Sequence, residues 1–282
     1  MKLLSLLTVL LAGLVGPSAT AAAAALALSA GGATLQFTSN ELMARQDTAA
    51  LAVPHDPAYG GPMSYRAVPL RALLAALPPD GGDTIQARAT DGFVAELPRA
   101  LIDGMAVPWI AVEDPAHPWP HLRGKTVSAG PFYLVWQDPD RARISTEQWA
   151  YALAALTVLP SPIQRWPAIA VDASVPEDAP LRRGQTAFIA NCLPCHRLAG
   201  GGEGIVGPDL LQPMPATAYF TEVGLHALIR NPAAVRSWPA QQMPAFEVAT
   251  LRDAEIDAII AYLRYLHARS KCAASGSLVT CR

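Results

Sequence analysis

The chain has 282 residues, which is enough for one large domain or two ordinary ones. Hydrophobic residues make up 51% of the chain and charged residues 16%, so the composition supports a buried core and excludes wholesale disorder. The formal net charge is -2 and there are no long runs of one sign, so we expect no nucleic-acid partner.

The first 23 residues have the pattern of a secretory signal peptide. Lys2 is followed by an apolar stretch over residues 3–15, and Ala19-Thr20-Ala21 has the A-x-A form of a cleavage site. The apolar stretch is shorter than the about 20 residues that a bilayer span needs, and an uncleaved N-terminal anchor is the alternative. We assign residues 1–23 to a signal peptide and expect a periplasmic protein, secreted across the inner membrane, without a stable membrane span after cleavage.

Residues 33–170 are expected to form an α+β domain, because helical spacing and alternating segments occur in turn along this region. Pro78 ends one helical pattern, and Asp91-Gly92 lies at the centre of an alternating segment typical of a hairpin. In chain order we expect a strand and helix over 33–45 with Ser39 or Asn40 as the N-cap, a helix over 68–77, a hairpin over 84–97, and strands over 125–136 and 148–159.

A proline-rich segment separates the two halves of the chain. Residues 160–180 contain five prolines, which remove backbone donors and favour an extended chain. We expect a semi-rigid linker at residues 171–180, with the domain boundary near residue 175. Trp166 and Ile169 leave open whether the first part of the segment packs on the N-terminal domain.

Residues 181–270 are expected to form an all-α domain. Pro180 begins a helical pattern that continues to Cys192, and at a helix start its missing N–H has no cost. A second helix is expected to end before Pro232. The third pattern, over 253–269, has one apolar stripe, acidic residues in its first turn and basic residues near its end.

Residues 271–282 form a C-terminal tail that contains Cys272 and Cys281. In an exported protein we expect these two cysteines to pair in a disulfide that closes the tail. An intermolecular bridge and a metal–thiolate site are the alternatives.

Cys192, Cys195 and His196 have the spacing of c-type haem attachment. Two thiols add to the two vinyl groups of the porphyrin, and the imidazole that follows lies under the iron as the proximal ligand. A redox disulfide and a zinc site are the alternatives. The first favours a strand before the cysteines, whereas a helix is expected here. The second needs a further pair of ligands at matching spacing, which the tail cysteines do not provide.

An iron in an electron-carrying haem usually takes a second axial ligand, and two methionines follow the motif. Met214 lies 18 residues after His196, and Met243 lies 47 residues after it. A loop must pass around the haem edge to reach the opposite face, so the longer reach favours Met243. Core packing is the alternative role of either methionine, and His226 and His267 are alternative ligands.

Residues 178–270 resemble a class I cytochrome c through the ordered motifs "CLPCH", "GPDL" and "MPAF" between a first helix and a long last helix. The resemblance implies that the first and last helices cross at Gly184, Phe188 and Tyr262. It also implies that the Pro208 carbonyl accepts a hydrogen bond from His196. The implied cofactor is one covalent haem c, with Cys192, Cys195, His196, Pro208 and Met243 as the cofactor-binding residues and His196 and Met243 as the iron ligands.

With both axial positions filled, no coordination site is open to O₂ or substrate, so we expect single-electron transfer and no catalytic residue. The partners would be redox proteins, namely a periplasmic dehydrogenase, a terminal oxidase or another acceptor. The alternative is a haem-bearing electron-transfer subunit of a periplasmic oxidoreductase whose N-terminal module binds substrate or cofactor. A module that senses redox state is a third possibility.

The N-terminal half is similar to the molybdopterin-binding domain of the sulfite oxidase superfamily in "VPLRALL", "DGFVAELP" and "SAGPFYLVW". That family holds molybdenum through a cysteine, and residues 33–170 contain none. The resemblance therefore implies a cofactor-free relative without molybdenum chemistry. An unrelated α+β module is the alternative.

Overall fold

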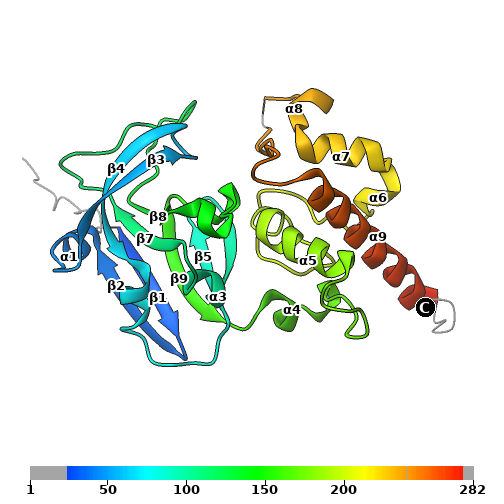
Figure 1. The fold of residues 1–282 in the computed structure, drawn as a ribbon, viewed down its shortest axis with the longest axis horizontal. Coiled ribbons are helices and arrows are strands. Elements are labelled where there is room, and N and C mark those ends of the chain that lie inside the picture. Colours follow the sequence, from blue (N-terminus) through cyan, green and yellow to red (C-terminus); the bar gives the residue numbers. More distant parts are fainter. Residues whose placement is uncertain (1–23, 240, 276–282) are drawn as a thin grey trace, which may run out of the picture.

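The computed structural model describes residues 24–239 and 241–275, and the predicted signal peptide lies outside the described residues. Figure 1 shows a sheet-rich N-terminal half beside a helical C-terminal half, with α4 (Pro162–Arg165) between them. Within the described ranges, no helix combines the length and the apolar character that a membrane crossing requires.

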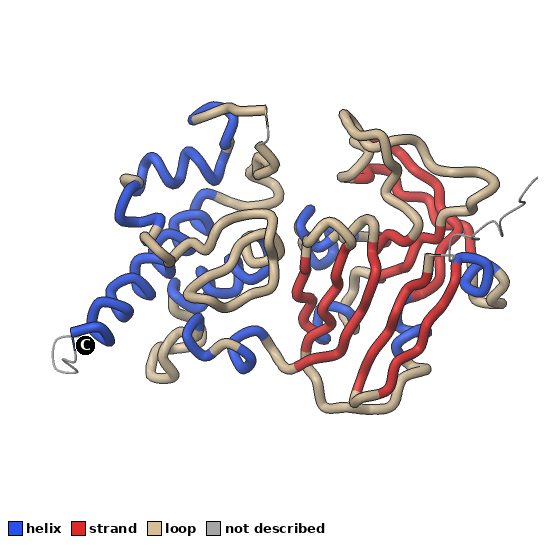
Figure 2. The backbone as a smooth tube through the Cα atoms, turned by 180° about the vertical axis from the view of Figure 1, so that it is seen from behind, coloured by secondary structure: helices blue, strands red, loops and turns tan. Residues whose placement is uncertain are grey.

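The N-terminal half contains two sheets, which Figure 2 shows as the strand-rich part of the chain. One sheet has the order β2-β1-β9-β5-β6, and the other has the order β3-β4-β7-β8. All neighbouring strands are antiparallel except β1 and β9, which are parallel. The strands are β1 (Ala25–Ala30), β2 (Ala33–Thr38), β3 (Ala49–Asp56), β4 (Gly61–Pro69), β5 (Thr84–Ala89), β6 (Val94–Pro98), β7 (Val107–Val112), β8 (Phe132–Gln137) and β9 (Leu153–Leu159).

The helical elements of this half are short. They are α1 (Ser39–Met43), α2 (Leu70–Leu74), α3 (Arg99–Ile102) and the 3₁₀ turns η1 (Pro139–Ala142) and η2 (Thr146–Gln148). The predicted helix over 68–77 is reduced to α2, because Val68 and Pro69 pair with β7 as the end of β4. The N-cap of α1 is Thr38 and not Ser39 or Asn40, because Thr38 and Glu41 form a capping box.

The predicted hairpin is confirmed as β5 and β6, and two further predicted strands are present as β8 and β9. Four strands were not predicted, namely β1, β3, β4 and β7. β1 lies ahead of residue 33, where we expected the folded domain to start, and its residues follow an alanine-rich run that resembles the end of a signal peptide. Leu26 and Leu28 of β1 are fully buried, so this strand is part of the core of the mixed, sheet-rich half.

The C-terminal half contains the three predicted helices, α5 (Pro180–Asn191), α7 (Glu222–Arg230) and α9 (Asp253–Ser275), and two short ones, α6 (Ala216–Tyr219) and α8 (Pro232–Val235). α5 crosses α9 at Gly184, where an added Cβ would lie 2.1 Å from the carbonyl oxygen of Ala258. The rings of Phe188 and Tyr262 pack beside this point with centroids 5.7 Å apart. The three residues expected at the helix crossing therefore meet there.

The proline-rich segment packs on the C-terminal domain. Ile169 and Val171 are buried in the same core as Phe188, and Trp166 packs against that core. The Tyr262 hydroxyl donates to the Ile169 carbonyl at 2.5 Å. The change from one hydrophobic core to the other therefore lies before Ile169, ahead of the expected position near residue 175.

A cluster of charged side chains, buried at Glu96 and partly exposed at Arg88 and Glu203, joins the two halves. Arg165 donates to Glu96 of β6 at 2.5 Å and lies 3.5 Å from Glu203 of the C-terminal domain. Gln86 donates to Glu96 at 3.0 Å, and Arg88 pairs with Glu203. Burial raises the pKa of Glu96, whose side chain is only 2% exposed, and the Arg165 guanidinium opposes that rise.

Gly184→Ala should destabilise the protein although alanine is the better helix former. The new Cβ would overlap a backbone carbonyl that cannot rotate away, and overpacking of this kind costs about 1–3 kcal/mol. Gly61→Ala is the control, because a Cβ at Gly61 meets nothing within 4 Å. Urea unfolding of both variants measures the difference, and a Gly184→Ala variant as stable as wild type would contradict the packing described.

Arg165→Met should be far more disruptive than Arg88→Met. The first leaves the buried Glu96 carboxylate without its charged partner, which costs about 3–5 kcal/mol. The second removes a pair whose arginine is 40% exposed, worth about 1 kcal/mol at most. The loss in Arg165→Met should shrink at acidic pH, where Glu96 becomes protonated. Equal losses in the two variants, measured by unfolding at several pH values, would contradict this assignment.

Candidate cofactor site

A cavity of about 510 Å³ lies in the C-terminal domain, within the size range of cofactor and ligand sites. Most of its walls come from α5, α7, α9 and the loops between them. Most of the lining side chains are apolar, among them Phe188, Leu210, Phe220, Leu225, Phe246 and Ile259. A flat apolar group in this cavity would be shielded from water over much of its surface.

Cys192 and Cys195 line this cavity as free thiols at the end of α5. The helix ends there, and the backbone N–H groups of Cys195 and His196 both donate to the Cys192 carbonyl, at 3.1 and 2.9 Å. This tight turn brings both sulfurs to the cavity. The three residues of the sequence motif are therefore all lining residues of one site.

The His196 ring is held by the backbone of the following loop. Its Nδ1 lies 2.8 Å from the Pro208 carbonyl oxygen, and because a carbonyl only accepts, Nδ1 donates. The other nitrogen, Nε2, is then available as a metal ligand. A Cβ at Gly207 would lie 2.4 Å from the ring, so glycine is required for this close approach. Burial lowers the pKa of His196, which favours the neutral ring that binds metals.

Asp209 organises this loop, and the sequence analysis did not single it out. Its carboxylate accepts from the backbone N–H groups of Ala199, Gly200, Leu211 and Gln212, at 2.7 to 3.1 Å. These four bonds fix the chain on both sides of Pro208. Asp209 is part of the "GPDL" motif. The backbone groups that it binds come from two separate segments, so the motif alone does not reveal this role.

Met243 lines the cavity and is half-buried against the same core. Met214 is 57% exposed and is not a lining residue. The two alternative histidines also lie elsewhere, since His226 is 3.6 Å from Asp253 and His267 is 3.0 Å from the Thr217 hydroxyl. Of the four candidate distal ligands, only Met243 is placed with Cys192, Cys195 and His196.

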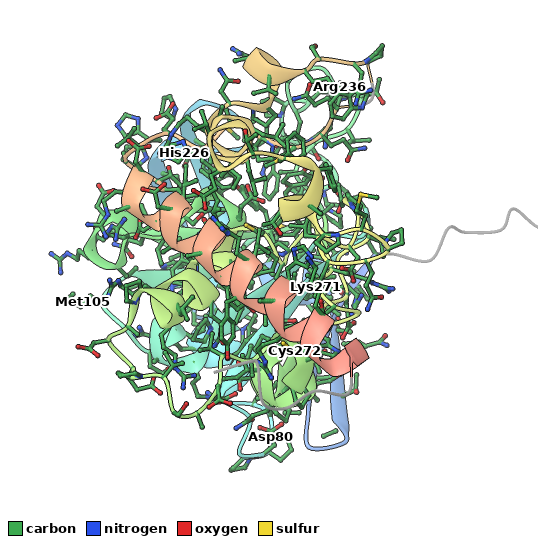
Figure 3. All side chains as sticks on the ribbon, turned by 90° about the vertical axis from the view of Figure 1, so that its right-hand side faces the viewer. Asp80, Met105, His226, Arg236, Lys271 and Cys272 are labelled. Carbon is green, nitrogen blue, oxygen red and sulfur yellow. The ribbon has the colours of Figure 1, made fainter. Side chains whose placement is uncertain are left out.

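Arg236 is a cationic residue of the cavity wall, and its guanidinium lies over the ring of Trp238 at 5.4 Å. Figure 3 shows Arg236 well separated from Lys271 and Cys272, which lie near the C-terminal end of α9. Cys272 is disulfide-bonded, and Cys281 lies outside the described residues.

Glu147 is a lining residue that the sequence analysis missed, and it comes from η2 of the N-terminal half. The residue is 9% exposed, and burial raises its pKa to about 7. Burial also raises the pKa of Cys192 and that of Cys195, the latter to about 12, and the negative charge of Glu147 adds to both shifts. No local sequence signal connects residue 147 with a motif that begins at residue 192.

The residues present fit a covalently attached haem better than the alternatives. A redox-active cysteine pair needs thiols of lowered pKa, and these thiols have raised values. In the part of the chain that the structure describes, no group of three or more His, Cys, Asp or Glu side chains is arranged so that it could hold a metal ion by itself. Two thiols and an imidazole are the groups that attach and ligate haem c, and the thioether beside the same apolar cavity suits a second axial ligand.

The comparison with protein families agrees with this geometry. The family model described as "Cytochrome c" matches residues 181–267. No curated protein matches the chain. Residues 181–267 are thus similar to a cytochrome c domain, a class that binds haem c and transfers electrons. The match does not reach the N-terminal half, so the similarity to the molybdopterin-binding domain has no support from it.

Proposed function

We propose that the protein is a periplasmic cytochrome that carries single electrons through one covalently bound haem c with His196 and Met243 as axial ligands. The observation that carries the proposal is the convergence of Cys192, Cys195, His196 and Met243 on one apolar cavity. No other group of residues in the described part of the chain joins two thiols, an imidazole and a thioether in one place.

Each residue has a defined task in this proposal. Cys192 and Cys195 fix the porphyrin as thioethers, and Pro208 holds the His196 ring by accepting from Nδ1. The haem supplies a one-electron couple whose potential is higher with His/Met than with His/His ligation. Arg236 supplies positive charge to the cavity wall, suited to the acidic substituents of a haem. The apolar walls exclude water.

Two observations support the periplasmic location. Residues 1–23 have the pattern of a signal peptide, and Cys272 is disulfide-bonded, as expected in an oxidising compartment. The partners in this proposal are redox proteins, with a periplasmic dehydrogenase as donor and a terminal oxidase or another protein as acceptor.

The covalent bond is tested on protein made in a host that is competent for haem attachment. Wild type should hold one iron and keep its haem through acid-acetone extraction, whereas the Cys192→Ala/Cys195→Ala double variant should release it. The double variant Cys272→Ala/Cys281→Ala removes the same number of sulfurs and should keep its haem. A colourless wild-type protein would refute the proposal, and stoichiometric molybdenum or pterin beside the iron would favour the oxidoreductase subunit.

Met243→Ala should remove the thioether ligand, lower the reduction potential and abolish the far-red absorption band of the oxidised protein. Met214→Ala removes the same side chain from an exposed position and should leave both unchanged. Optical titration of the two variants measures the effect. If Met214→Ala rather than Met243→Ala loses the band, the ligand assignment is wrong.

A further inference from the structure

We infer that Glu147, contributed by the N-terminal half, sets the potential of the haem site and takes up a proton when the site takes up an electron. This inference rests on the proposed function. It gives the N-terminal half a role in the redox chemistry, because that half then supplies an ionisable group to the cofactor of the other half.

The first support is position. Glu147 lines the same cavity as Cys192, Cys195 and His196, and it is almost fully buried although it belongs to the other domain. A carboxylate in a low-dielectric site acts on a nearby charge more strongly than one in water. Its effect on the cofactor is therefore larger than that of an exposed acidic residue at a similar separation.

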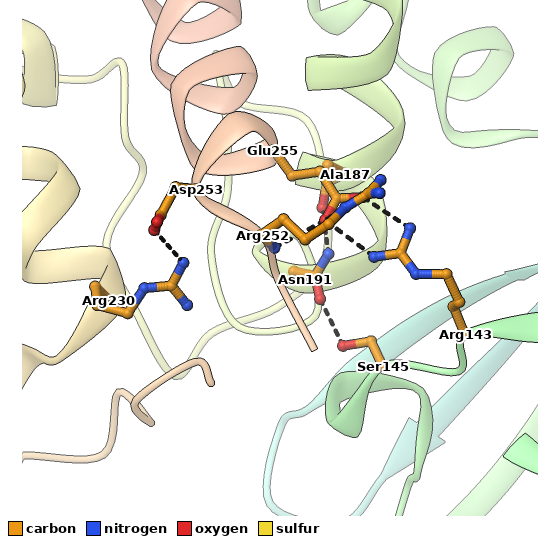
Figure 4. A network of polar contacts seen from close by, with 8 residues as sticks. All are labelled: Arg143, Ser145, Ala187, Asn191, Arg230, Arg252, Asp253 and Glu255. Carbon is orange, nitrogen blue, oxygen red and sulfur yellow. Dashed lines mark hydrogen bonds and ion pairs between the residues drawn. The ribbon is translucent and has the colours of Figure 1, made fainter. Parts of the chain in front are cut away.

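The second support is rigidity. Ser145 caps η2 by accepting from the Glu147 N–H at 3.3 Å, while Gln148 Oε1 accepts from the Ser145 N–H at 2.8 Å. The Ser145 hydroxyl donates in turn to Asn191 Oδ1 at 2.5 Å, and Asn191 is the residue before Cys192. Figure 4 shows this contact between the two halves. The position of Glu147 is thereby tied to that of the first haem-attaching cysteine.

A second hydrogen bond holds the N-terminal domain against the segment that carries Cys192 and Cys195. Val94 of β6 donates from its backbone N–H to the Pro194 carbonyl at 3.0 Å, and Pro194 lies between the two cysteines. The hairpin and η2 thus hold the segment at two points. These contacts keep the backbone of Glu147 beside the cavity for as long as the domain interface is closed.

The third support is the lack of a compensating cation. Arg143, on the same loop, is engaged by Glu255 of α9 at 3.1 Å (Figure 4), and no ion pair of Glu147 is found among the described residues. The groups on which its charge acts are Cys192 and Cys195, and these thiols become uncharged thioethers once haem is attached. Two charged groups lie farther round the site, namely Asp91 on the hairpin, which acts on Cys195, and Arg236 on the cavity wall.

The coupling follows from charge balance. Burial raises the pKa of Glu147 to about 7, so small changes of local charge decide its protonation near neutral pH. The oxidised site carries one more positive charge, which favours the Glu147 carboxylate. When one electron arrives from the donor, Glu147 binds one proton from solvent, and it releases that proton when the electron leaves. By linkage, the proton must raise the potential as much as the electron raises the proton affinity.

The test is the reduction potential of the purified holoprotein between about pH 5 and about pH 9. The wild-type potential should fall with rising pH around neutrality. The steepest slope that one proton per electron allows is about 59 mV per pH unit, because 59 mV corresponds to a tenfold change in the equilibrium constant of a one-electron couple. Glu147→Gln keeps the size of the side chain and removes the proton site. Its potential should be nearly constant over this range and higher than that of wild type at alkaline pH.

Asp91→Asn is the matched control, because it removes an exposed carboxylate that also acts on Cys195. This variant should keep the wild-type pH dependence. A second measurement is the infrared difference spectrum between the reduced and oxidised forms. A band of a protonated carboxyl should appear on reduction in wild type and be absent in Glu147→Gln.

The outcomes separate the two proposals. A protein with covalent haem whose potential does not change with pH, or whose pH dependence survives in Glu147→Gln, overturns only the role of Glu147. A protein without covalent haem overturns both. Loss of the pH dependence in Asp91→Asn but not in Glu147→Gln would move the proton site to the hairpin and overturn the inference.

Discussion

α5 and α9 approach so closely at Gly184 that a single added carbon would overlap the backbone of α9. This crossing fixes the axis of α5, and the cysteine motif begins where α5 ends. Phe188 and Ile259, which line the cavity, are carried by the same two helices. The positions of the thiols and of the cavity wall formed by Phe188 and Ile259 therefore depend on one contact between Gly184 and a backbone carbonyl group of α9.

The loop that contains Pro208 and Asp209 depends on this helix crossing in a different way. Its own hydrogen bonds, from His196 Nδ1 to the Pro208 carbonyl and from four backbone N–H groups to Asp209, shape it locally. Leu198 and Leu211 of this loop are buried in the core that α5 and α9 form. Helix packing supplies the walls and hydrogen bonds supply the orientation of the imidazole, so both are needed for a site that can hold a rigid planar group.

Local patterns predicted much of the C-terminal domain. Spacing located the motif and the three longer helices, because helices and turns are determined by neighbours in the sequence. The residues at the crossing of the first and last helices came from the resemblance to class I cytochromes c. The prediction failed where long-range pairing decides the structure. β1 follows an alanine-rich run typical of a processed leader, and its pairing with β2 and with the distant β9 identifies it as a strand. Glu147 lies in the candidate site because the two domains are in contact, and sequence spacing does not predict such a contact.

The proline-rich segment both joins the two halves and locks them together. Arg165 belongs to this segment and binds Glu96 on one side and Glu203 on the other, while Trp166 and Ile169 pack into the C-terminal core. A fragment that begins at residue 171 would therefore lack side chains that complete the hydrophobic core of the C-terminal domain. A fragment intended to fold independently has to begin near Pro160. The C-terminal domain that packs as one unit is therefore longer than residues 181–267, which the family model matches.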